Sequence, residues 1–397
     1  MIEPKHLLNN HLAQTTPYNM GITVSHSDGL YIYDVSGKRY MDLISGLGVS
    51  SLGHNNQAVN EALKAQIDQY LHVMVYGEFV QEPQLKLGKL LAEHLPPHLD
   101  TCYFVNSGTE ANEAAIKLAK RVTGRRKLIA FEGSYHGSTH GSLSVSFNKT
   151  KKYAFLPLLP EVSFIKLNNY EQLAQIDESV ACVLLETIQG DAGIRIPDIA
   201  FMQALKKRCD ETGTLLIFDE IQAGLGRAGT LFAFEYYQVC PDILTLGKAL
   251  GGGLPIGALI SSKEKMEQFT FSPMLGHITT FGGHPLPCTA AYAGLNFLLD
   301  NQLIKEVNIK GKLLHDLLIK HPLVKEIRYR GLFFAIEMAD ADIVQKIVEG
   351  CLEKGMITFW FLSCPNAFRL APPLTVTYEE IELACKEMIE VFDSVSL

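Results

Sequence analysis

Short, nearly uninterrupted apolar runs recur through the middle of the chain, separated by helical periods or long crossings. Such runs are typical of strands in a mostly parallel sheet that helices cover on both faces. In such sheets ligands bind beyond the carboxyl ends of the strands. We therefore predict an α/β protein with strands at 101–105, 127–131, 162–167, 180–186, 214–220, 243–247 and 256–261, and a helix from 107 to about 122.

The two ends of the chain follow other patterns. Residues 30–43 alternate apolar and polar side chains around the turn Ser36-Gly37-Lys38, which predicts a short antiparallel hairpin. Further periodicity predicts helices at 56–72, 287–300, 303–320, 341–354 and 378–395 and strands at 324–339 and 356–362. We expect an N-terminal segment over 1–55, a large domain over 56–288, and a smaller α+β domain over 289–397 that packs with the N-terminal segment.

Composition narrows the class of protein. The chain has 397 residues, of which 47% are hydrophobic, and this rules out a disordered or fibrous protein. The formal net charge of -8 disfavours nucleic acid and anionic membranes as partners, and favours a small molecule. The eight cysteines are scattered, without a CxxC motif or clustering with histidine. That distribution argues against a metal site and for reduced thiols in the cytoplasm.

The helix predicted after strand 101–105 begins with residues that suit an anion. Ser107 and Glu110 fit an S-x-x-E capping box, and Gly108 lets a ligand approach the backbone closely. The free amides of Gly108 and Thr109, with the helix dipole, favour a phosphate group, although an ordinary helix cap is the commoner explanation. Neither a P-loop motif nor a GxGxxG motif occurs, so nucleoside triphosphates and dinucleotides lack their usual signatures.

Two charged residues follow buried strands. Asp219 comes directly after an apolar run, where a desolvated carboxylate needs a cation as partner. Lys248 lies inside the apolar stretch 243–262, whose glycines and proline disfavour a membrane span. Burial lowers the pKa of a lysine and makes its neutral amine a nucleophile for Schiff-base chemistry. A helix-capping or metal-binding aspartate and an ion-paired or snorkelling lysine are the alternatives.

Together, a phosphate site, an acid at a strand end and a buried amine are the parts that hold pyridoxal phosphate. Motifs along nearly the whole chain resemble the class III pyridoxal-phosphate aminotransferases of the acetylornithine, ornithine and 4-aminobutyrate type. The resemblance implies fold type I, an obligate homodimer with active sites at the interface, and ping-pong transfer of an amino group to an oxo acid such as 2-oxoglutarate or pyruvate. It rests on residues 29–54, 106–115, 131–139, 186–193, 219–235, 241–258, 279–288 and 368–374.

The resemblance also implies roles for single residues. Lys248 resembles the lysine that forms the Schiff base with the cofactor, and Asp219 the partner of the ring nitrogen. In the same way, Ser107, Gly108 and Thr109 match the phosphate cup, Tyr135 the aromatic that stacks on the ring, Gln222 the partner of the phenolic oxygen, Glu186 a carboxylate near the cofactor, and Thr280 the threonine that reaches the phosphate from the other subunit. By themselves, Tyr135, Glu186 and Thr280 would be ordinary core, strand-end and strand residues.

The substrate is less determined than the cofactor. Arg369 matches the arginine that binds the α-carboxylate of glutamate or 2-oxoglutarate, with a domain-packing arginine as the alternative. Asp191 stands where ornithine-type members carry a glutamate that pairs with this arginine, and it is one methylene shorter. Ser138 stands where ornithine and acetylornithine members have an arginine for a second carboxylate, which favours amines, β-amino acids or ω-amino compounds as donors. Tyr18 and Tyr76 are further pocket candidates.

Other activities use the same cofactor. An aminomutase, racemase or lyase on this fold would share the cofactor-binding motifs, because the reaction depends on which bond at the substrate carbon lies perpendicular to the ring. A cofactor-binding regulator is a third alternative, which the acidic charge and the lack of a helix-turn-helix motif disfavour. We predict an aminotransferase.

Overall fold

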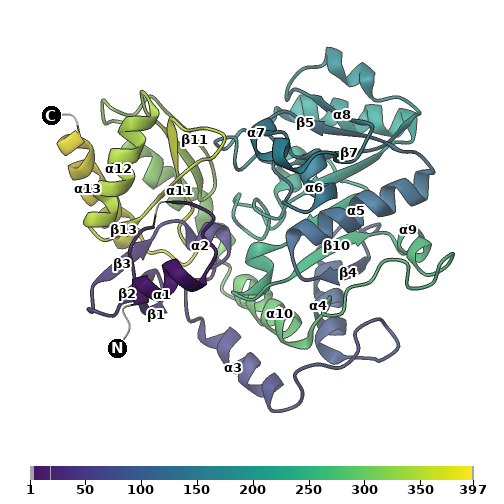
Figure 1. Cartoon of the computed structure of the whole chain (residues 1–397), viewed down its shortest axis with the longest axis horizontal. Coiled ribbons are helices and arrows are strands. Elements are labelled where there is room, and N and C mark those ends of the chain that lie inside the picture. Colours follow the sequence, from purple (N-terminus) through teal and green to yellow (C-terminus); the bar gives the residue numbers. More distant parts are fainter. Residues whose placement is uncertain (1–3, 18, 396–397) are drawn as a thin grey trace.

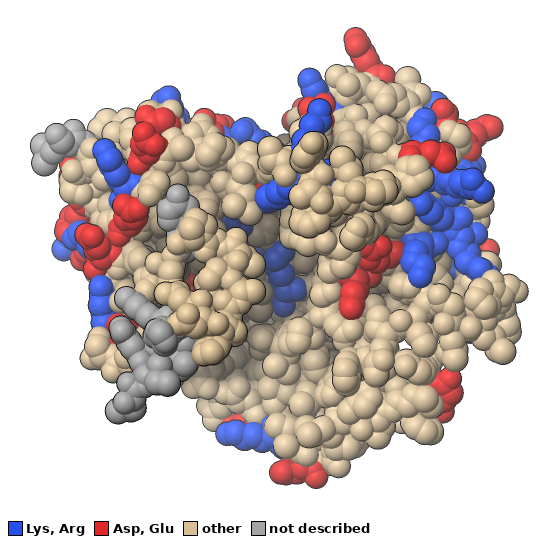
Figure 2. Space-filling view, viewed as in Figure 1, with Lys and Arg blue, Asp and Glu red and all other residues tan. Residues whose placement is uncertain are grey.

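A computed structural model describes residues 4–17 and 19–395 of the protein. One lobe is built around a seven-stranded sheet, the other around a four-stranded sheet of the C-terminal part, and the N-terminal strands lie beside the second lobe (Figure 1). The space-filling view shows a hollow between the two lobes, with Lys and Arg side chains at its surface (Figure 2). The face of the molecule seen there is therefore hollowed where the lobes meet.

The large sheet has the strand order β4-β10-β9-β8-β7-β5-β6. Its neighbouring strands run parallel except for β10, which is antiparallel to both β4 and β9. This arrangement confirms the mostly parallel sheet predicted from the apolar runs. The strands are Thr101–Val105 (β4), Lys127–Phe131 (β5), Val162–Ile165 (β6), Val180–Glu186 (β7), Leu215–Asp219 (β8), Ile243–Leu246 (β9) and Gly257–Ser261 (β10).

The register of the central strands brings polar residues to one edge of this sheet. Glu186 of β7 pairs with Asp219 of β8, and Asp219 pairs with Thr245 of β9. Because these three strands are parallel, the paired residues lie side by side near the carboxyl ends. Lys248 begins a short 3₁₀ turn just after β9. The carboxylates of Glu186 and Asp219 and the side chain of Lys248 therefore belong to residues at the same edge of the sheet.

Helices cover both faces of the large sheet. Ile217 of β8 lies in one apolar cluster with the alanines of α5 (Gly108–Thr123), whereas Leu216 and Phe218 lie in another with residues of α8 (Ile199–Thr212). The alternation follows from the period of two along a strand. The other helices of this lobe are Gln57–Ile67 (α3), Glu82–Glu93 (α4), His140–Val145 (α6), Lys149–Lys152 (α7), Lys263–Met266 (α9) and Pro285–Asp300 (α10).

The C-terminal lobe contains an antiparallel sheet with the order β11-β12-β15-β14. Three helices, α11, α12 and α13, accompany it (Figure 1). Its strands are Glu326–Arg330 (β11), Phe333–Glu337 (β12), Phe359–Trp360 (β14) and Ala367–Leu370 (β15), and its helices are Ile304–Leu318 (α11), Ala341–Glu353 (α12) and Tyr378–Val395 (α13). The run 324–339, predicted as one strand region, is thus a hairpin of β11 and β12.

The N-terminal segment shares a sheet with the C-terminal part of the chain. The order is β1-β2-β3-β13, in which β2 and β3 form the predicted hairpin and β13 pairs in parallel with β3. The strand region predicted over 356–362 is confirmed, but it divides between two sheets: β13 joins the N-terminal sheet, and β14 joins the C-terminal one. The elements here are Pro4–His11 (α1), Val24–Asp28 (β1), Tyr31–Asp34 (β2), Arg39–Asp42 (β3), Ser45–Gly48 (α2) and Met356–Ile357 (β13).

A buried arginine joins the three parts of the fold. Arg227 follows β8, and its guanidinium donates hydrogen bonds to the carbonyl oxygens of Leu332 at 2.9 Å and Pro372 at 2.6 Å. It also donates to the hydroxyl of Ser51 at 2.9 Å. Since a buried charge is costly unless its donors are satisfied, these bonds fix the N-terminal segment and the C-terminal lobe against the large sheet.

The apolar stretch 243–262 forms β9, the 3₁₀ turn after it and β10. Across the described residues, no helix combines the length and apolar character needed to span a lipid bilayer.

Candidate active site

Asp219 is the most firmly oriented charged group at the carboxyl edge of the large sheet. Its Oδ2 accepts hydrogen bonds from Asn112 Nδ2 at 2.8 Å and from His136 Nδ1 at 2.7 Å, and its Oδ1 accepts one from the backbone amide of Ile221 at 3.0 Å. Asn112 is oriented in turn, because its Oδ1 accepts a hydrogen bond from the Thr245 hydroxyl at 2.8 Å. The carboxylate is buried and held in one orientation from three elements.

The negative charge of the Asp219 carboxylate acts on the amine of Lys248. Its backbone has φ of 44°, and its side chain passes the α-carbon of Gly48, where an added Cβ would lie 3.8 Å from Lys248 Cδ. Among the described residues its amine has no hydrogen-bond or ion-pair partner. Burial lowers the pKa of Lys248, and the negative charges of Asp219 and Glu186 oppose that shift. The amine is therefore neutral, and nucleophilic, at a lower pH than a free lysine.

Ser107, Gly108 and Thr109 form the surface at the start of α5. The hydroxyl of Ser107 accepts a hydrogen bond from the amide of Glu110 at 3.3 Å and caps the helix. The predicted capping box is only half formed, because the Glu110 carboxylate accepts its hydrogen bond from the Asn106 amide instead of the Ser107 amide. Gly108 packs on Ile221, where an added Cβ would lie 2.7 Å from Cδ1. A long helix that begins at such a surface favours an anion.

Glu186, Tyr135 and Gln222 surround the same region. The two oxygens of Glu186 accept hydrogen bonds from the amides of Tyr135 and Gly190, both at 2.9 Å. Burial raises the pKa of Glu186 to about 7, His136 opposes this shift, and Asp219 adds to it. Gln222 Oε1 lies only 2.0 Å from where a Cβ on Gly190 would stand, so the absence of a side chain at 190 makes room for Gln222.

Arg369 enters from β15 of the C-terminal lobe. It is buried, and one of its terminal nitrogens lies 3.5 Å from Asp191 Oδ1, longer than a charged hydrogen bond. Its guanidinium carbon lies 4.4 Å from the centre of the Phe361 ring, and its Nε has no partner among the described residues. The positive charge of Arg369 contributes to the lowered pKa of Lys248. Its donors are therefore largely free for a carboxylate.

A family model for class-III aminotransferases matches residues 13–392. The chain belongs to this family. The family predicted from the motifs is thereby confirmed, with its fold and its activity: the protein is a pyridoxal-phosphate-dependent aminotransferase.

Known relatives and solved structures are similar to this aminotransferase over nearly its whole length. An acetylornithine aminotransferase of Methanopyrus kandleri is 39% identical over 371 residues, 93% of this chain and 94% of the relative. A LysW-aminoadipate semialdehyde/glutamate semialdehyde transaminase of Sulfolobus acidocaldarius is 36% identical, over 93% of this chain and 94% of the relative. The crystal structure of an ornithine aminotransferase from Toxoplasma gondii superposes with a TM-score of 0.91 at 30% identity, over 99% of this chain and 94% of the other.

The residues of the aminotransferase suit its cofactor. Pyridoxal phosphate has a ring nitrogen that pairs with a carboxylate and an aldehyde that condenses with an amine, and the site contains the buried carboxylate of Asp219 and the amine of Lys248. A phosphate is bound by backbone amides, and the beginning of α5 has these at Gly108, where an added Cβ would press on the Ile221 side chain. These three kinds of group are the ones that pyridoxal phosphate requires.

Two predicted residues, Thr280 and Tyr76, have no hydrogen bond or ion pair that links them to these groups within the described part of the chain. Thr280 is exposed on the loop before α10, and its neighbour Thr279 accepts a hydrogen bond from Asn106 at 3.4 Å. Tyr76 lies near Tyr103 of β4, whose pKa it helps to raise. Tyr18 lies outside the described residues.

Residues that the sequence did not single out complete the site. Asn112 and His136 bond to Asp219, and Thr245 orients Asn112. A buried asparagine in the alanine face of α5 was the one signal in the sequence that pointed to such a network. Gly48 reaches Lys248 from the N-terminal segment, about two hundred residues earlier in the chain, and no local pattern reveals that contact.

Proposed function

We propose that Lys248 holds pyridoxal phosphate covalently in this aminotransferase and carries the proton during amino transfer. When bound, the cofactor supplies an aldehyde that condenses with primary amines and a ring that accepts the electron pair released at the substrate carbon. The observation that carries the proposal is the unpaired amine of Lys248, whose pKa is lowered by burial beside the oriented carboxylate of Asp219. An amine of lowered pKa can both attack an aldehyde and accept a proton, and it does so at a lower pH than an ordinary lysine.

The other groups would orient the cofactor. We assign the ring nitrogen to Asp219, because Asn112 and His136 keep the carboxylate in one orientation. The ring face is assigned to Tyr135 and the phenolic oxygen to Gln222, while Glu186 supports Tyr135 through its backbone amide. The phosphate is assigned to Ser107, Gly108 and Thr109 at the start of α5.

We assign the substrate carboxylate of the oxo acid to Arg369. A guanidinium binds a carboxylate through two parallel hydrogen bonds, and Arg369 has Nε free and only a long contact to Asp191. Relatives named for acetylornithine, ornithine and semialdehyde transamination support an ω-amino compound as donor. We therefore propose transfer of an ω-amino group to an oxo acid, with 2-oxoglutarate preferred over pyruvate.

Two loops support the assignment of a homodimer. Large apolar side chains are exposed at Met74, Phe79 and Val80 on one loop, and at Met274 and Phe281 on the other. The loops touch each other, since the rings of His72 and Phe281 lie 5.1 Å apart. Contiguous exposed apolar side chains favour association with a second copy. Thr280 lies in the second loop, and we propose that it reaches the cofactor phosphate of the partner subunit.

The eight cysteines are all free thiols. Most of them are buried, and burial raises the pKa of Cys102, Cys182 and Cys288 to about 12. Such thiols are poorly reactive. They support the proposal that the enzyme works in the reducing cytoplasm.

The test is to reduce the holoenzyme with borohydride and map the labelled peptide by mass spectrometry. We expect the pyridoxyl group on Lys248, and we expect Lys248→Ala to lose turnover with every donor. Lys263→Ala, at the start of α9, is the matched control and should keep both the label and the activity. A label on another lysine, or turnover by Lys248→Ala, would refute the assignment.

A panel of amino donors with pyruvate and 2-oxoglutarate then tests the substrates. Recovery of the cofactor absorbance by the oxo acid, after a donor has removed it, supports transamination. Bleaching without recovery would instead support a lyase or another reaction on this fold.

A further inference from the structure

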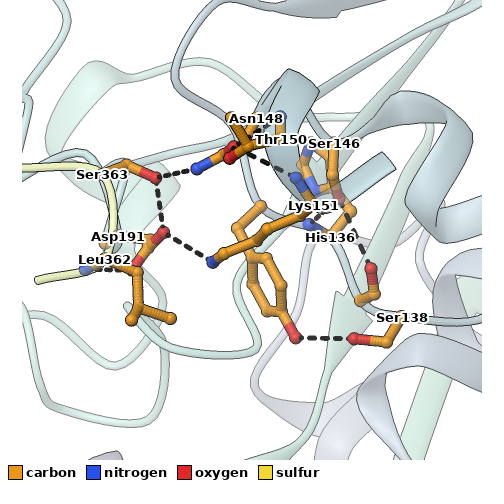
Figure 3. A network of polar contacts seen from close by, with 12 residues as sticks. His136, Ser138, Ser146, Asn148, Thr150, Lys151, Asp191, Leu362 and Ser363 are labelled. Atoms are coloured by element: carbon orange, nitrogen blue, oxygen red, sulfur yellow. Dashed lines mark hydrogen bonds and ion pairs between the residues drawn. The ribbon is translucent and has the colours of Figure 1, made fainter. Parts of the chain in front are cut away.

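Lys151 is a second cation, besides Arg369, that contacts Asp191 at the edge of the site. It belongs to the short helix α7, and its Nζ lies 3.5 Å from Asp191 Oδ2. The same ammonium lies 5.4 Å from the centre of the Tyr135 ring. Figure 3 shows the side chain of Lys151 extending toward Asp191, with Ser363 on the far side of the carboxylate. Asp191 is thus flanked by Lys151 on one oxygen and Arg369 on the other.

Asp191 is shared between two cations. Its carboxylate contacts both Lys151 and Arg369, and the negative charge of Glu186 also acts on Arg369. Both contacts measure 3.5 Å, longer than the roughly 2.7–2.9 Å of a charged hydrogen bond. Asp191 has other donors as well, because its oxygens accept hydrogen bonds from the Ser363 hydroxyl at 2.8 Å and the Leu362 amide at 3.3 Å. Lys151 can therefore turn to another anion without leaving Asp191 unpaired.

A cavity of about 550 Å³ lies beside this ammonium. Its wall includes polar groups of Tyr135, Ser138 and Lys151 together with the apolar side chains of Leu143 and Phe155. Cavities of this size and mixture bind small molecules whose polar end meets a few fixed groups and whose chain contacts apolar walls. The cavity adjoins Tyr135, which the proposed function places against the cofactor ring.

The other lysines of α7 are arranged differently. Lys149 is exposed, and Lys152 donates a hydrogen bond to the carbonyl oxygen of Ser144 at 2.8 Å while its ammonium lies 4.6 Å from the Phe164 ring centre. Ser138 is neutral, and its hydroxyl lies 3.3 Å from the Tyr135 phenol. Of the three lysines of α7, Lys151 is the one that lines the cavity.

We propose that Lys151 binds the carboxylate at the far end of the amino donor, so that the preferred donors are ω-amino acids rather than simple amines. This inference rests on the proposed function, because it concerns the donor of the same site. The amine end of the donor would point toward Lys248, and the tail carboxylate would meet the Nζ of Lys151, which has three N–H donors. An uncharged tail gains nothing from that ammonium.

The test compares two donors of equal length, 5-aminopentanoate and pentan-1-amine, in the wild-type holoenzyme and in Lys151→Met. The variant should lose roughly tenfold to a hundredfold in kcat/KM for 5-aminopentanoate, the size expected for one charged hydrogen bond. Its kcat/KM for pentan-1-amine should fall by a much smaller factor, because that donor has no carboxylate for Lys151 to bind. Lys149→Met, in the same helix, should match the wild type with both donors. Equal losses for the two donors, or no loss for 5-aminopentanoate, would overturn the proposal.

A binding measurement gives a readout that does not need turnover. Pentanoate, which has the tail but no amine, should bind the wild-type holoenzyme roughly tenfold more tightly than Lys151→Met in a calorimetric titration. Equal dissociation constants would overturn the tail assignment even if the enzyme were active. A missing pyridoxyl label on Lys248 in the wild type would refute the proposed function instead, and the pentanoate titration would still decide the role of Lys151.

Discussion

At the scale of single residues, the site depends on how one carboxylate is held. Asp219 receives hydrogen bonds from Asn112, His136 and the Ile221 amide, and these three residues come from α5, the loop after β5 and the turn after β8. A carboxylate fixed in this way needs no reorganisation when a positive charge develops beside it. Its charge also keeps the pKa of Lys248 from falling further.

The substitution Asp219→Asn tests both roles of this carboxylate, the electrostatic stabilisation of a nearby positive charge and the influence on the pKa of Lys248. Removing the charge should lower kcat by roughly a hundredfold to a thousandfold, as for other preorganised electrostatic partners. Because the negative charge raises the pKa of Lys248, its loss should lower that pKa, and the amine should become reactive at a lower pH. The pH dependence of the rate at which cofactor-free enzyme takes up pyridoxal phosphate measures the shift.

The control for this substitution is Asp242→Asn. Asp242 accepts a hydrogen bond from the Leu216 amide at 3.0 Å but is not among the charges that act on Lys248. Its replacement should leave the pH profile in place. An unchanged kcat in Asp219→Asn would contradict the role given to this carboxylate.

At the scale of elements, the apolar patterns were sufficient to locate most of the strands. The runs at 101–105, 127–131 and 180–186 form β4, β5 and β7 with the predicted bounds. The run 356–362 is also extended, but its pattern did not show which strands it would pair with. Met356 pairs with Met41, whereas Phe359 pairs with Arg369, so one run serves two sheets. Pairing between distant segments depends on packing that a local pattern does not contain.

The packing of α5 against the turn after β8 can be tested through its first glycine. In Gly108→Ala the new methyl would approach the Ile221 side chain to 2.7 Å, so we expect weaker cofactor binding and a stability loss of about 1–3 kcal/mol. Adding Ile221→Ala should recover part of both. The dissociation constant for pyridoxal phosphate and the urea unfolding midpoint measure the two effects.

Gly88→Ala in α4 is the matched control. An added Cβ there meets nothing within 4 Å, and the position is helical, so this variant should gain up to about 1 kcal/mol. Identical behaviour of Gly88→Ala and Gly108→Ala would show that the start of α5 has no special packing requirement.

At the scale of the whole molecule, the site is assembled from distant parts of the chain. Gly48 of the N-terminal segment lies against Lys248, and Arg369 of the C-terminal lobe acts on its pKa. Arg227 holds the N-terminal segment and the C-terminal lobe together through Ser51 and Pro372. The proposed homodimer would add one more part, Thr280 of the second subunit.

Mixed dimers test that last part. Subunits carrying Lys248→Ala and subunits carrying Thr280→Ala, coexpressed with different tags, should form dimers in which one site has both native residues. About half of the sites in the purified mixed dimer should then be native, which corresponds to about a quarter of all sites in the unfractionated mixture. Bound cofactor and activity of the purified mixed dimer are the measurements. No recovery above the separate variants would mean that Thr280 does not act across the interface.

The sequence by itself determined the family, the cofactor and the strands of the large sheet, because these depend on local runs and on motifs whose spacing is fixed within short segments. It also placed Asp219 at the end of one apolar run and Lys248 just after another, and the parallel pairing of β8 and β9 brings these two positions to one edge. Only the tertiary structure decided the network around Asp219, the contact of Gly48 with Lys248, and the position of Lys151 between Asp191 and Tyr135. Those contacts join residues that are far apart in the chain, and packing of whole elements, rather than local preference, brings them together.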